Sequence, residues 1–109
     1  MKKELRIRKN EEFSSIMKLR NSNANKSFVL YYAPRKLDHA RAGISVSKKL
    51  GDAVDRNRIK RQVRAMLLKV FDFEESQIDI IVIVRTHFLE NDFETNQSDL
   101  EKTIKKVII

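Results

Sequence analysis

The first element that the hydrophobic pattern predicts is a helix near the start of the chain. Phe13, Ile16 and Met17 recur at intervals of three and four residues, which predicts a short amphipathic helix. Asn10 stands where such a helix needs an N-cap, and two acidic residues follow it at the positive end of the helix dipole. The polar run 21–25 then predicts a break in regular structure.

Two strands are predicted next along the chain. The apolar run 28–33 has the composition of a strand, and Pro34 is expected to end it. Residues 41–47 alternate, with Ile44 and Val46 on one side and small polar residues on the other. This alternation is typical of a strand with one buried face.

A second, longer helix is predicted to begin near residues 54–56. Gly51 supplies the turn before it, and either Asp52 or Asp55 is expected to cap it. Its apolar residues fall within one arc of the helix, which predicts the side that packs on the sheet. They are Ile59, Val63, Met66, Leu67 and Val70. On the opposite side of this helix we expect the polar residues Asn57, Lys60, Arg61 and Arg64.

The last third of the chain adds one strand and one helix. Residues 78–84 form a nearly continuous apolar run, as in a strand buried on both faces. Leu100, Ile104 and Val107 then give the core stripe of a final helix. The order helix–strand–strand–helix–strand–helix predicts an α+β protein, a two-layer α/β sandwich with helices against a small sheet. At this length we expect a single domain over residues 1–109.

Composition narrows the class of protein. A hydrophobic content of 41% disfavours wholesale disorder. The absence of cysteine excludes disulfides and thiolate metal sites. No apolar run approaches the roughly 20 residues of a membrane span. A cytoplasmic protein is therefore expected.

The formal charge of +8 is divided unevenly along the chain. Residues 1–69 hold 19 Lys and Arg against 6 Asp and Glu, whereas residues 70–109 hold 4 against 9. Residues 48–64 are the densest basic segment, and like charges at helical spacing repel one another. The helix that begins there also offers unpaired N–H groups that suit a phosphate. This distribution favours a polyanionic partner, of which a nucleic acid backbone is the simplest.

The same segment resembles a known family. Residues 43–51 read Gly-Ile-Ser-Val-Ser-Lys-Lys-Leu-Gly, and together with residues 53–54 and 56–61 they resemble the signature of the bacterial ribonuclease P protein subunit. The Arg56-Asn57-Arg58 triplet within it is the hallmark of that family. Three further segments lie where the family has them: residues 5–13, 28–32 and 80–84. The resemblance therefore covers nearly the whole chain.

The resemblance implies the small subunit of a ribonucleoprotein endonuclease that removes the 5′ leader of precursor tRNA. The catalytic centre and its Mg²⁺ ions are then expected in the RNA subunit, with no catalytic residue and no metal ligand in the protein. The implied partners are ribonuclease P RNA and precursor tRNA. The implied fold is ribosomal protein S5 domain 2-like, with a left-handed β-α-β crossover and a fourth strand that the hydrophobic pattern does not reveal.

The resemblance also assigns contacts to particular residues. It implies that one basic group contacts the catalytic RNA: Lys48, Lys49, Arg56, Asn57, Arg58, Lys60, Arg61 and Arg64. It places a cleft for the single-stranded leader between the first helix and the sheet, where aromatic side chains stack on bases. The residues that match this cleft are Phe13, Met17 and Tyr31. Met17 stands where many relatives carry an aromatic residue, so weaker stacking is expected there.

Strand alternation separates the aromatic residues of the first predicted strand. Phe28, Leu30 and Tyr32 share one face and are assigned to the core, and Tyr31 points to the other face. The spacing of Phe13 and Met17 fits a core position as well as a cleft. On the residues alone, both interpretations of this pair stay open.

Alternative functions use the same residues. A general RNA-binding or ribosome-associated module would use the same basic helix. A DNA-binding protein would insert that helix into the major groove, although a strand and not a helix precedes it here. Membrane binding needs an exposed apolar face, which this helix requires for the sheet. Neither DNA nor a membrane is therefore expected as a partner.

The two histidines do not indicate a catalytic site. His39 and His87 lack a second histidine at catalytic or metal-ligand spacing, and only Asp38 adjoins His39. This disfavours a hydrolytic site in the protein itself.

Overall fold

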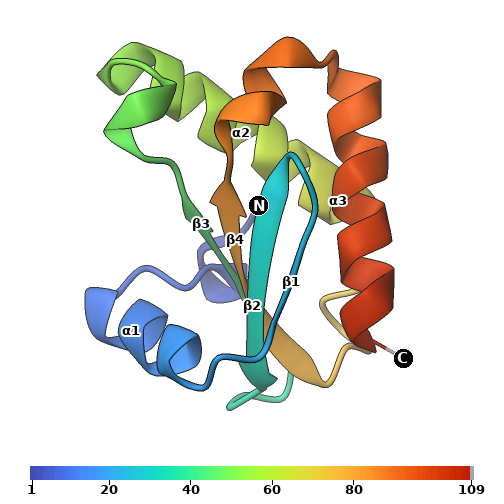
Figure 1. The fold of residues 1–109 in the computed structure, drawn as a ribbon. Coiled ribbons are helices and arrows are strands. Elements are labelled where there is room, and N and C mark those ends of the chain that lie inside the picture. The colour runs from blue at the N-terminus through green and yellow to red at the C-terminus, as the bar shows by residue number, and fades with distance from the viewer. Residues whose placement is uncertain (109) are drawn as a thin grey trace.

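A computed structural model describes residues 1–108 of the chain (Figure 1). The described residues form three α-helices, four strands and three short 3₁₀ helices. In chain order the elements are η1 (Lys3–Leu5), α1 (Asn10–Lys18), β1 (Ser22–Ala24), β2 (Phe28–Pro34), β3 (Ala42–Ser45), η2 (Lys48–Leu50), α2 (Ala53–Val70), β4 (Ile78–Val84), η3 (Thr86–Glu90) and α3 (Phe93–Ile108). The predicted α+β class is confirmed.

One four-stranded sheet organises the molecule in the order β1-β2-β4-β3. Strands β1 and β2 pair antiparallel, as do β2 and β4, whereas β3 runs parallel to β4. The parallel pair needs a crossover connection, and α2 supplies it. Strand β4 lies inside the sheet and is buried along most of its length, as its continuous apolar sequence predicts.

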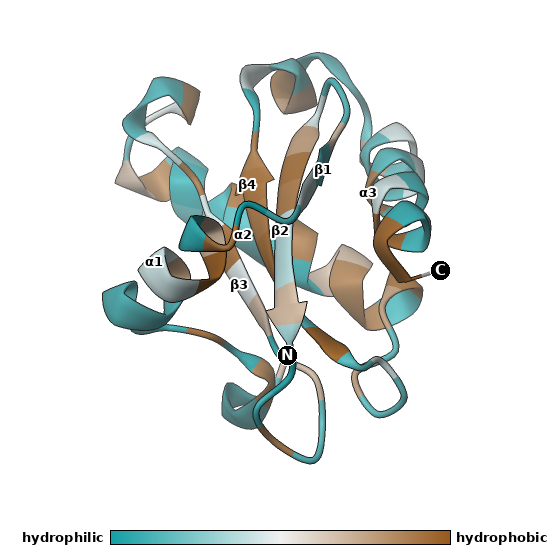
Figure 2. Ribbon diagram, turned by 60° about the horizontal axis from the view of Figure 1, so that its bottom comes forward, coloured by the Kyte–Doolittle hydropathy of each residue, from teal (hydrophilic) through white to brown (hydrophobic). Residues whose placement is uncertain are grey.

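The main core lies between the sheet and helices α2 and α3 (Figure 2). The apolar stripe of α2 and residues Leu100 and Ile104 of α3 meet the face of the sheet that carries Phe28 and Leu30. Tyr32 packs against the same cluster, so this assignment to the core is confirmed. This arrangement is the predicted sandwich of helices on a small sheet.

Helix α1 packs on the other face of the sheet. A smaller cluster there joins Ile16 of α1 to Ala33 and Ile81 of the sheet and to Ile7 of the preceding segment. Phe13 and Tyr31 pack against this cluster and stay partly exposed. The two faces therefore carry cores of unequal size.

Strand β1 lies in the segment predicted as a break in regular structure, so that prediction is wrong. Its residues are polar or small and mostly exposed, and they carry no hydrophobic signal. The strand is held by backbone pairing with β2 and by Asn23, whose Nδ2 donates to Oγ1 of Thr103 at 3.1 Å. In the turn, Oδ1 of Asn25 accepts the backbone N–H groups of Ser27 and Phe28. A local hairpin with β2 and a long-range contact to α3 thus hold the fourth strand that the resemblance implies.

Two smaller predictions also need correction. Asn10 is the first residue of α1 rather than its N-cap; Lys9 holds that position, with no side-chain capping bond. The strand expected over 41–47 is shorter and spans Ala42–Ser45. Within residues 1–108, every helix is too short or too polar to cross a lipid bilayer.

Candidate nucleic-acid interface

The basic segment enters α2 through a fixed turn. Asp52 is the N-cap, its side chain accepts the Asp55 N–H at 3.0 Å, and Oδ2 of Asp55 accepts the Asp52 N–H at 3.3 Å. The hydrogen bond that the Asp55 backbone N–H donates to Asp52 lowers the pKa of the Asp52 carboxyl. Gly51 has φ 138°, and a Cβ there would lie 2.6 Å from Asp55. Glycine is therefore required at the turn, and both aspartates act at the cap.

The outer side of α2 and the preceding turn present exposed polar residues to solvent. They are Lys48, Lys49, Asn57, Arg58 and Arg61. The helix is anchored from beneath by its buried apolar stripe. The stripe therefore holds these charges on a rigid support, as the sequence predicts.

Two residues of the basic triplet are held by the start of the helix itself. Nη2 of Arg58 lies 3.1 Å from Oδ1 of Asp55. Nε of Arg56 donates to the backbone oxygen of Asp52 at 3.3 Å. An exposed ion pair of this kind contributes little to stability, so its main effect is to orient the guanidinium group.

Lys60 and Arg64 do not lie on the outer side with Asn57 and Arg61, and that part of the prediction is wrong. Both are half-buried, because the flank of α2 on which they lie faces β3 and the segment before α1. There they line a cavity of about 300 Å³ between α2, β3 and the segment before α1. A second cavity of about 410 Å³ shares four of its lining residues: Arg8, Phe13, Ile44 and Lys60. We call the two cavities together the basic hollow.

The basic hollow gathers cations from two separate segments. Arg6 and Arg8 come from the chain before α1, and Lys60 and Arg64 come from α2. The lining of the first cavity includes no acidic residue. Burial, together with the nearby positive charge of Arg6, lowers the pKa of the Arg64 guanidinium. Positive charges held this close favour a bound anion.

Arg6 and Arg8 are functional candidates that the sequence analysis missed. The backbone N–H of Ile7 donates to the Ala42 carbonyl at 2.9 Å, and Arg6 forms a parallel bridge with Ala42. The segment therefore runs beside the edge of β3, with Ile7 buried. The alternation Arg6-Ile7-Arg8 is the signal in the sequence that indicates this extended segment.

Phe13 connects the smaller core to the basic hollow. A Cβ built on Gly43 would lie 2.6 Å from Cζ of Phe13, so the ring rests directly on the backbone of β3. The ring also lines both cavities of the hollow beside Lys60. Phe13 therefore packs against the smaller core and also borders the hollow, and its contact with a leader stays a prediction.

The other two predicted cleft residues do not line the basic hollow. Tyr31 packs on the same smaller cluster as Phe13 but lines neither cavity. Met17 borders a shallow surface cavity with Ser14, Lys18 and Arg20, which adjoins the hollow at Ser14. Phe13 is therefore the member of the trio that the structure brings together with the basic residues.

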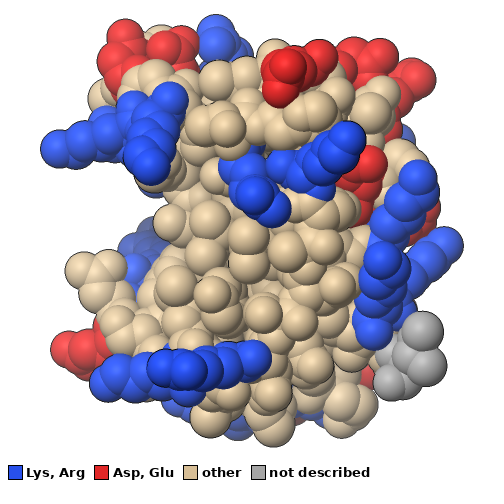
Figure 3. Space-filling view, viewed as in Figure 1, with Lys and Arg blue, Asp and Glu red and all other residues tan. Residues whose placement is uncertain are grey.

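The space-filling view shows the surface hollowed between the region of η2 and the start of α2 on one side and α1 on the other (Figure 3). Lysine and arginine side chains border this depression. Within residues 1–108, no three His, Cys, Asp or Glu side chains gather in a group that could hold a metal ion. The surface thus offers positive charge and an aromatic ring.

These features define a class of protein: a small α+β domain with a surface suited to a polyanion. The sequence model of the family described as Ribonuclease P matches residues 1–108. The chain belongs to this family of ribonuclease P proteins.

Relatives and solved structures agree with this assignment. The ribonuclease P protein component of Shouchella clausii is 46% identical over 107 residues, covering 97% of this chain and 88% of the relative. That of Mesoplasma florum is 39% identical over 109 residues, covering 99% of both. The RNase P protein structure from Staphylococcus aureus aligns with a TM-score of 0.81 at 41% identity, covering 94% of each chain. The one from Thermotoga maritima gives 0.80 at 32%, covering 93% of this chain and 96% of the other.

Proposed function

We propose that this chain is the protein subunit of a ribonuclease P and supports removal of the 5′ leader from precursor tRNA. The observation that carries the proposal is the basic hollow, which sets Phe13 beside Lys60 and Arg64 in a chain of this family. An aromatic ring beside cations is the combination that single-stranded RNA requires, because bases stack on the ring while phosphates pair with the cations.

Two surfaces divide the work in this proposal. The exposed residues of η2 and α2 bind the ribonuclease P RNA through its phosphates, because they are cationic and held on a rigid helix. The basic hollow takes the unpaired leader of the precursor tRNA. Arg56 and Arg58 lie at the start of α2, where the helix dipole adds to their attraction for phosphate.

Met17 and Tyr31 have lesser roles in the proposal. Met17 is one helical turn from Phe13 on α1 and is half-buried, so it contacts the leader beyond the hollow. Tyr31 supports the floor under α1 through the smaller cluster. In both cases the contribution to leader binding is smaller than that of Phe13.

Catalysis is assigned to the RNA partner. The proposed holoenzyme uses Mg²⁺ ions bound by the RNA for hydrolysis, and the protein contributes binding and orientation. The exposed pair His87 and Glu90, 2.9 Å apart on η3, lies on a different element from the basic hollow and has no role in this scheme.

Reconstitution tests the proposal. The protein is mixed with its cognate ribonuclease P RNA, and 5′-leader removal from a precursor tRNA is followed at low Mg²⁺. We expect strong enhancement of cleavage by the protein and no cleavage by the protein alone. Tight RNA binding without enhancement would overturn the proposal in favour of a general RNA-binding module.

Leader length gives the second discriminating measurement. The affinity of the holoenzyme is measured for mature tRNA and for precursors whose leaders grow one nucleotide at a time. We expect affinity to rise until the leader fills the basic hollow and then to level off. A general RNA-binding module predicts a steady increase with length, because each added phosphate contributes similarly.

A further inference from the structure

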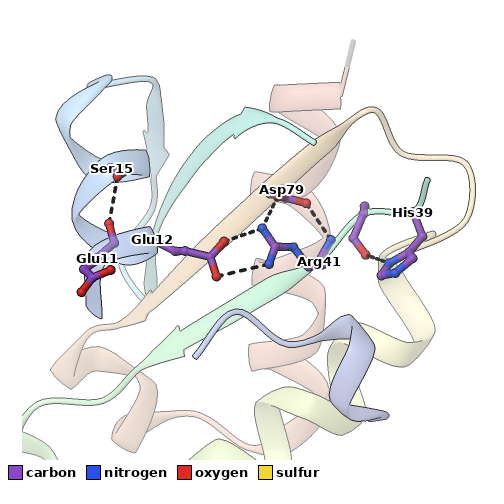
Figure 4. Close-up of polar contacts among 7 residues, drawn as sticks. Glu11, Glu12, Ser15, His39, Arg41 and Asp79 are labelled. Carbon is purple, nitrogen blue, oxygen red and sulfur yellow. Dashed lines mark hydrogen bonds and ion pairs between the residues drawn. The ribbon is translucent and has the colours of Figure 1, made fainter. Parts of the chain in front are cut away.

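A buried ion network joins α1 to the sheet (Figure 4). Arg41 directly precedes β3, and only 11% of its side chain is exposed. Its Nη2 lies 2.7 Å from Oε2 of Glu12 and 3.1 Å from Oδ2 of Asp79, and its Nη1 lies 3.3 Å from Oε1 of Glu12. Oδ1 of Asp79 accepts the backbone N–H of Arg41 at 2.8 Å. One guanidinium group therefore links α1, β3 and β4.

The hydrogen bonds between Glu12 and Arg41 favour the charged forms of both side chains, whereas burial disfavours them. The hydrogen bond from Arg41 lowers the pKa of the Glu12 carboxyl, and the hydrogen bond to Glu12 raises the pKa of Arg41. Asp79 is 1% exposed, so its partnership with Arg41 offsets the cost of burying a carboxylate. Removal of Glu12 would leave Arg41 bound to Asp79 and to the sheet, but free of α1.

Helix α1 has few other attachments. It has nine residues, its N-cap makes no side-chain bond, and Ile16 is its buried residue. A helix of this length is marginal without tertiary contacts. The carboxylate of Glu12 is therefore a main constraint on where α1 lies.

The network and the aromatic ring contact neighbouring points of one strand segment. Glu12 meets Arg41, and Phe13, the next residue of α1, meets Gly43, two residues beyond Arg41. Residues two apart in an extended segment share one face, so both contacts fix the same edge of α1 against the sheet. A shift of α1 at Glu12 would move the Phe13 ring along β3.

We propose that Arg41 is a positioning residue, which through Glu12 holds α1 so that Phe13 stays at the wall of the basic hollow. The inference rests on the proposed function, because it assigns leader recognition to Phe13. Its consequence is selective: loss of the Glu12 carboxylate weakens recognition of the leader and leaves binding of the catalytic RNA by α2 unchanged.

The test uses Glu12→Gln, with Glu11→Gln as the matched control. Glu11 is the preceding residue of α1 and is exposed, so its variant makes the same change in charge and composition without breaking the network. In the holoenzyme, we expect the preference for precursor over mature tRNA to fall about tenfold in Glu12→Gln, as for one lost charge-assisted hydrogen bond. We expect no change in Glu11→Gln, and recovery in Glu12→Asp, which restores the carboxylate.

A spectroscopic signature separates positioning from simple stability. The chain has two glycines, so the Gly43 and Gly51 signals are readily resolved by NMR. The Phe13 ring lies against Gly43, so we expect its ring current to shift the Gly43 Hα resonance, whereas Gly51 lies in the turn before α2 and serves as an internal reference. In the free protein we expect Glu12→Gln to move the Gly43 signal toward its random-coil position and Glu11→Gln to leave it in place.

Phe13→Ala completes the experiment by testing the proposed function on its own. If Phe13→Ala abolishes the preference for precursor tRNA while Glu12→Gln retains both the preference and the Gly43 shift, the positioning role is overturned and the proposed function stands. If Phe13→Ala also leaves the preference intact, leader recognition at the hollow fails, and the positioning role fails with it.

Discussion

The two faces of the central sheet differ in how they are covered. On one face, α2 and α3 bury a continuous cluster in which many side chains are inaccessible to solvent. On the other, the nine-residue α1 covers a cluster of four buried residues, and an ion network adds to its attachment. The larger core supplies most of the stability, and the thinner cover leaves space beside it for the basic hollow. The comparison teaches that a small domain can bury most of its apolar residues on one face of a sheet and leave an open hollow at the sheet edge, between α2, β3 and α1.

Leu67→Ala removes a side chain from the larger core and has the largest expected effect on stability. Leu67 is 0% exposed, so truncation leaves a cavity and lowers the free energy of unfolding by about 2–5 kcal/mol, measured by urea denaturation. Leu68→Ala on the next position is the control, because Leu68 is 54% exposed and its loss should change stability by less than about 0.5 kcal/mol. Equal effects would contradict the location of the core.

Gly43→Ala tests the face of the sheet that α1 covers, because it adds a methyl group beneath Phe13. The new Cβ would lie 2.6 Å from Cζ of Phe13 and 2.9 Å from Cδ1 of Ile81, so the ring must move. We expect a loss of about 1–3 kcal/mol in the free energy of unfolding. The double variant Gly43→Ala/Phe13→Ala relieves the clash with the ring, so the two changes should be non-additive. Strict additivity would show that the ring does not rest on Gly43.

Arg61→Ala leaves both cores intact and tests the outer surface of α2. Arg61 is exposed, so its loss should leave stability unchanged and weaken assembly with the ribonuclease P RNA by about 1–3 kcal/mol. The slope of log affinity against log salt should fall by about one. Lys69→Ala removes the same charge from the other end of α2 and should have a smaller effect. An equal loss of affinity in both variants would show that Arg61 acts only through its general positive charge.

The dependence of stability on pH is the smallest expected difference between the two faces. In the folded protein, the hydrogen bond from Arg41 lowers the pKa of the Glu12 carboxyl below its ordinary value of 4.5. The stability that this carboxylate contributes is therefore present above pH 4.5 and is lost as the pH falls through its folded pKa. Asp52 and Asp92 have lowered pKa values as well and lose their contributions in the same range, so a variant is needed to isolate Glu12.

Unfolding of wild type, Glu12→Gln and Glu11→Gln is followed from pH 6 down to about pH 3, across the range in which carboxylates titrate. We expect Glu12→Gln to show a shallower loss of stability below pH 4.5 than the other two proteins. Parallel curves for wild type and Glu12→Gln would show that the pair with Arg41 makes no net contribution to folding.

Much of the larger core could be predicted from sequence because its signals are local. The apolar run of β4 was predicted with its observed bounds, Ile78–Val84. The cap of α2 was also predictable, since Asp52 and Asp55 have the spacing of a capping box. In both cases, residues close in sequence determine the structure.

Other features were less predictable because they depend on contacts that the hydrophobic pattern does not show. Strand β1 has no hydrophobic pattern and exists through pairing with β2. Lys60 and Arg64 were placed on the outer side of α2, because no helical projection indicates that Arg6 and Arg8 will come to lie beside them. The partnership of Arg41 with Glu12 joins residues 29 positions apart, and no spacing rule connects them. The family resemblance assigns Phe13 to the leader cleft, a role that the pattern alone left undecided and that stays a prediction.

The order of strands in the sheet has a consequence for biosynthesis. The strand that joins β2 to β3 is β4, which follows both of them in the chain and leaves the ribosome after them. Until residue 84 emerges, the nascent chain can form the β1–β2 hairpin but not the sheet, and the strongly basic first part of the chain lacks its scaffold. The sheet therefore cannot form before β4 is available, because the non-local pairings on which it depends all involve that strand.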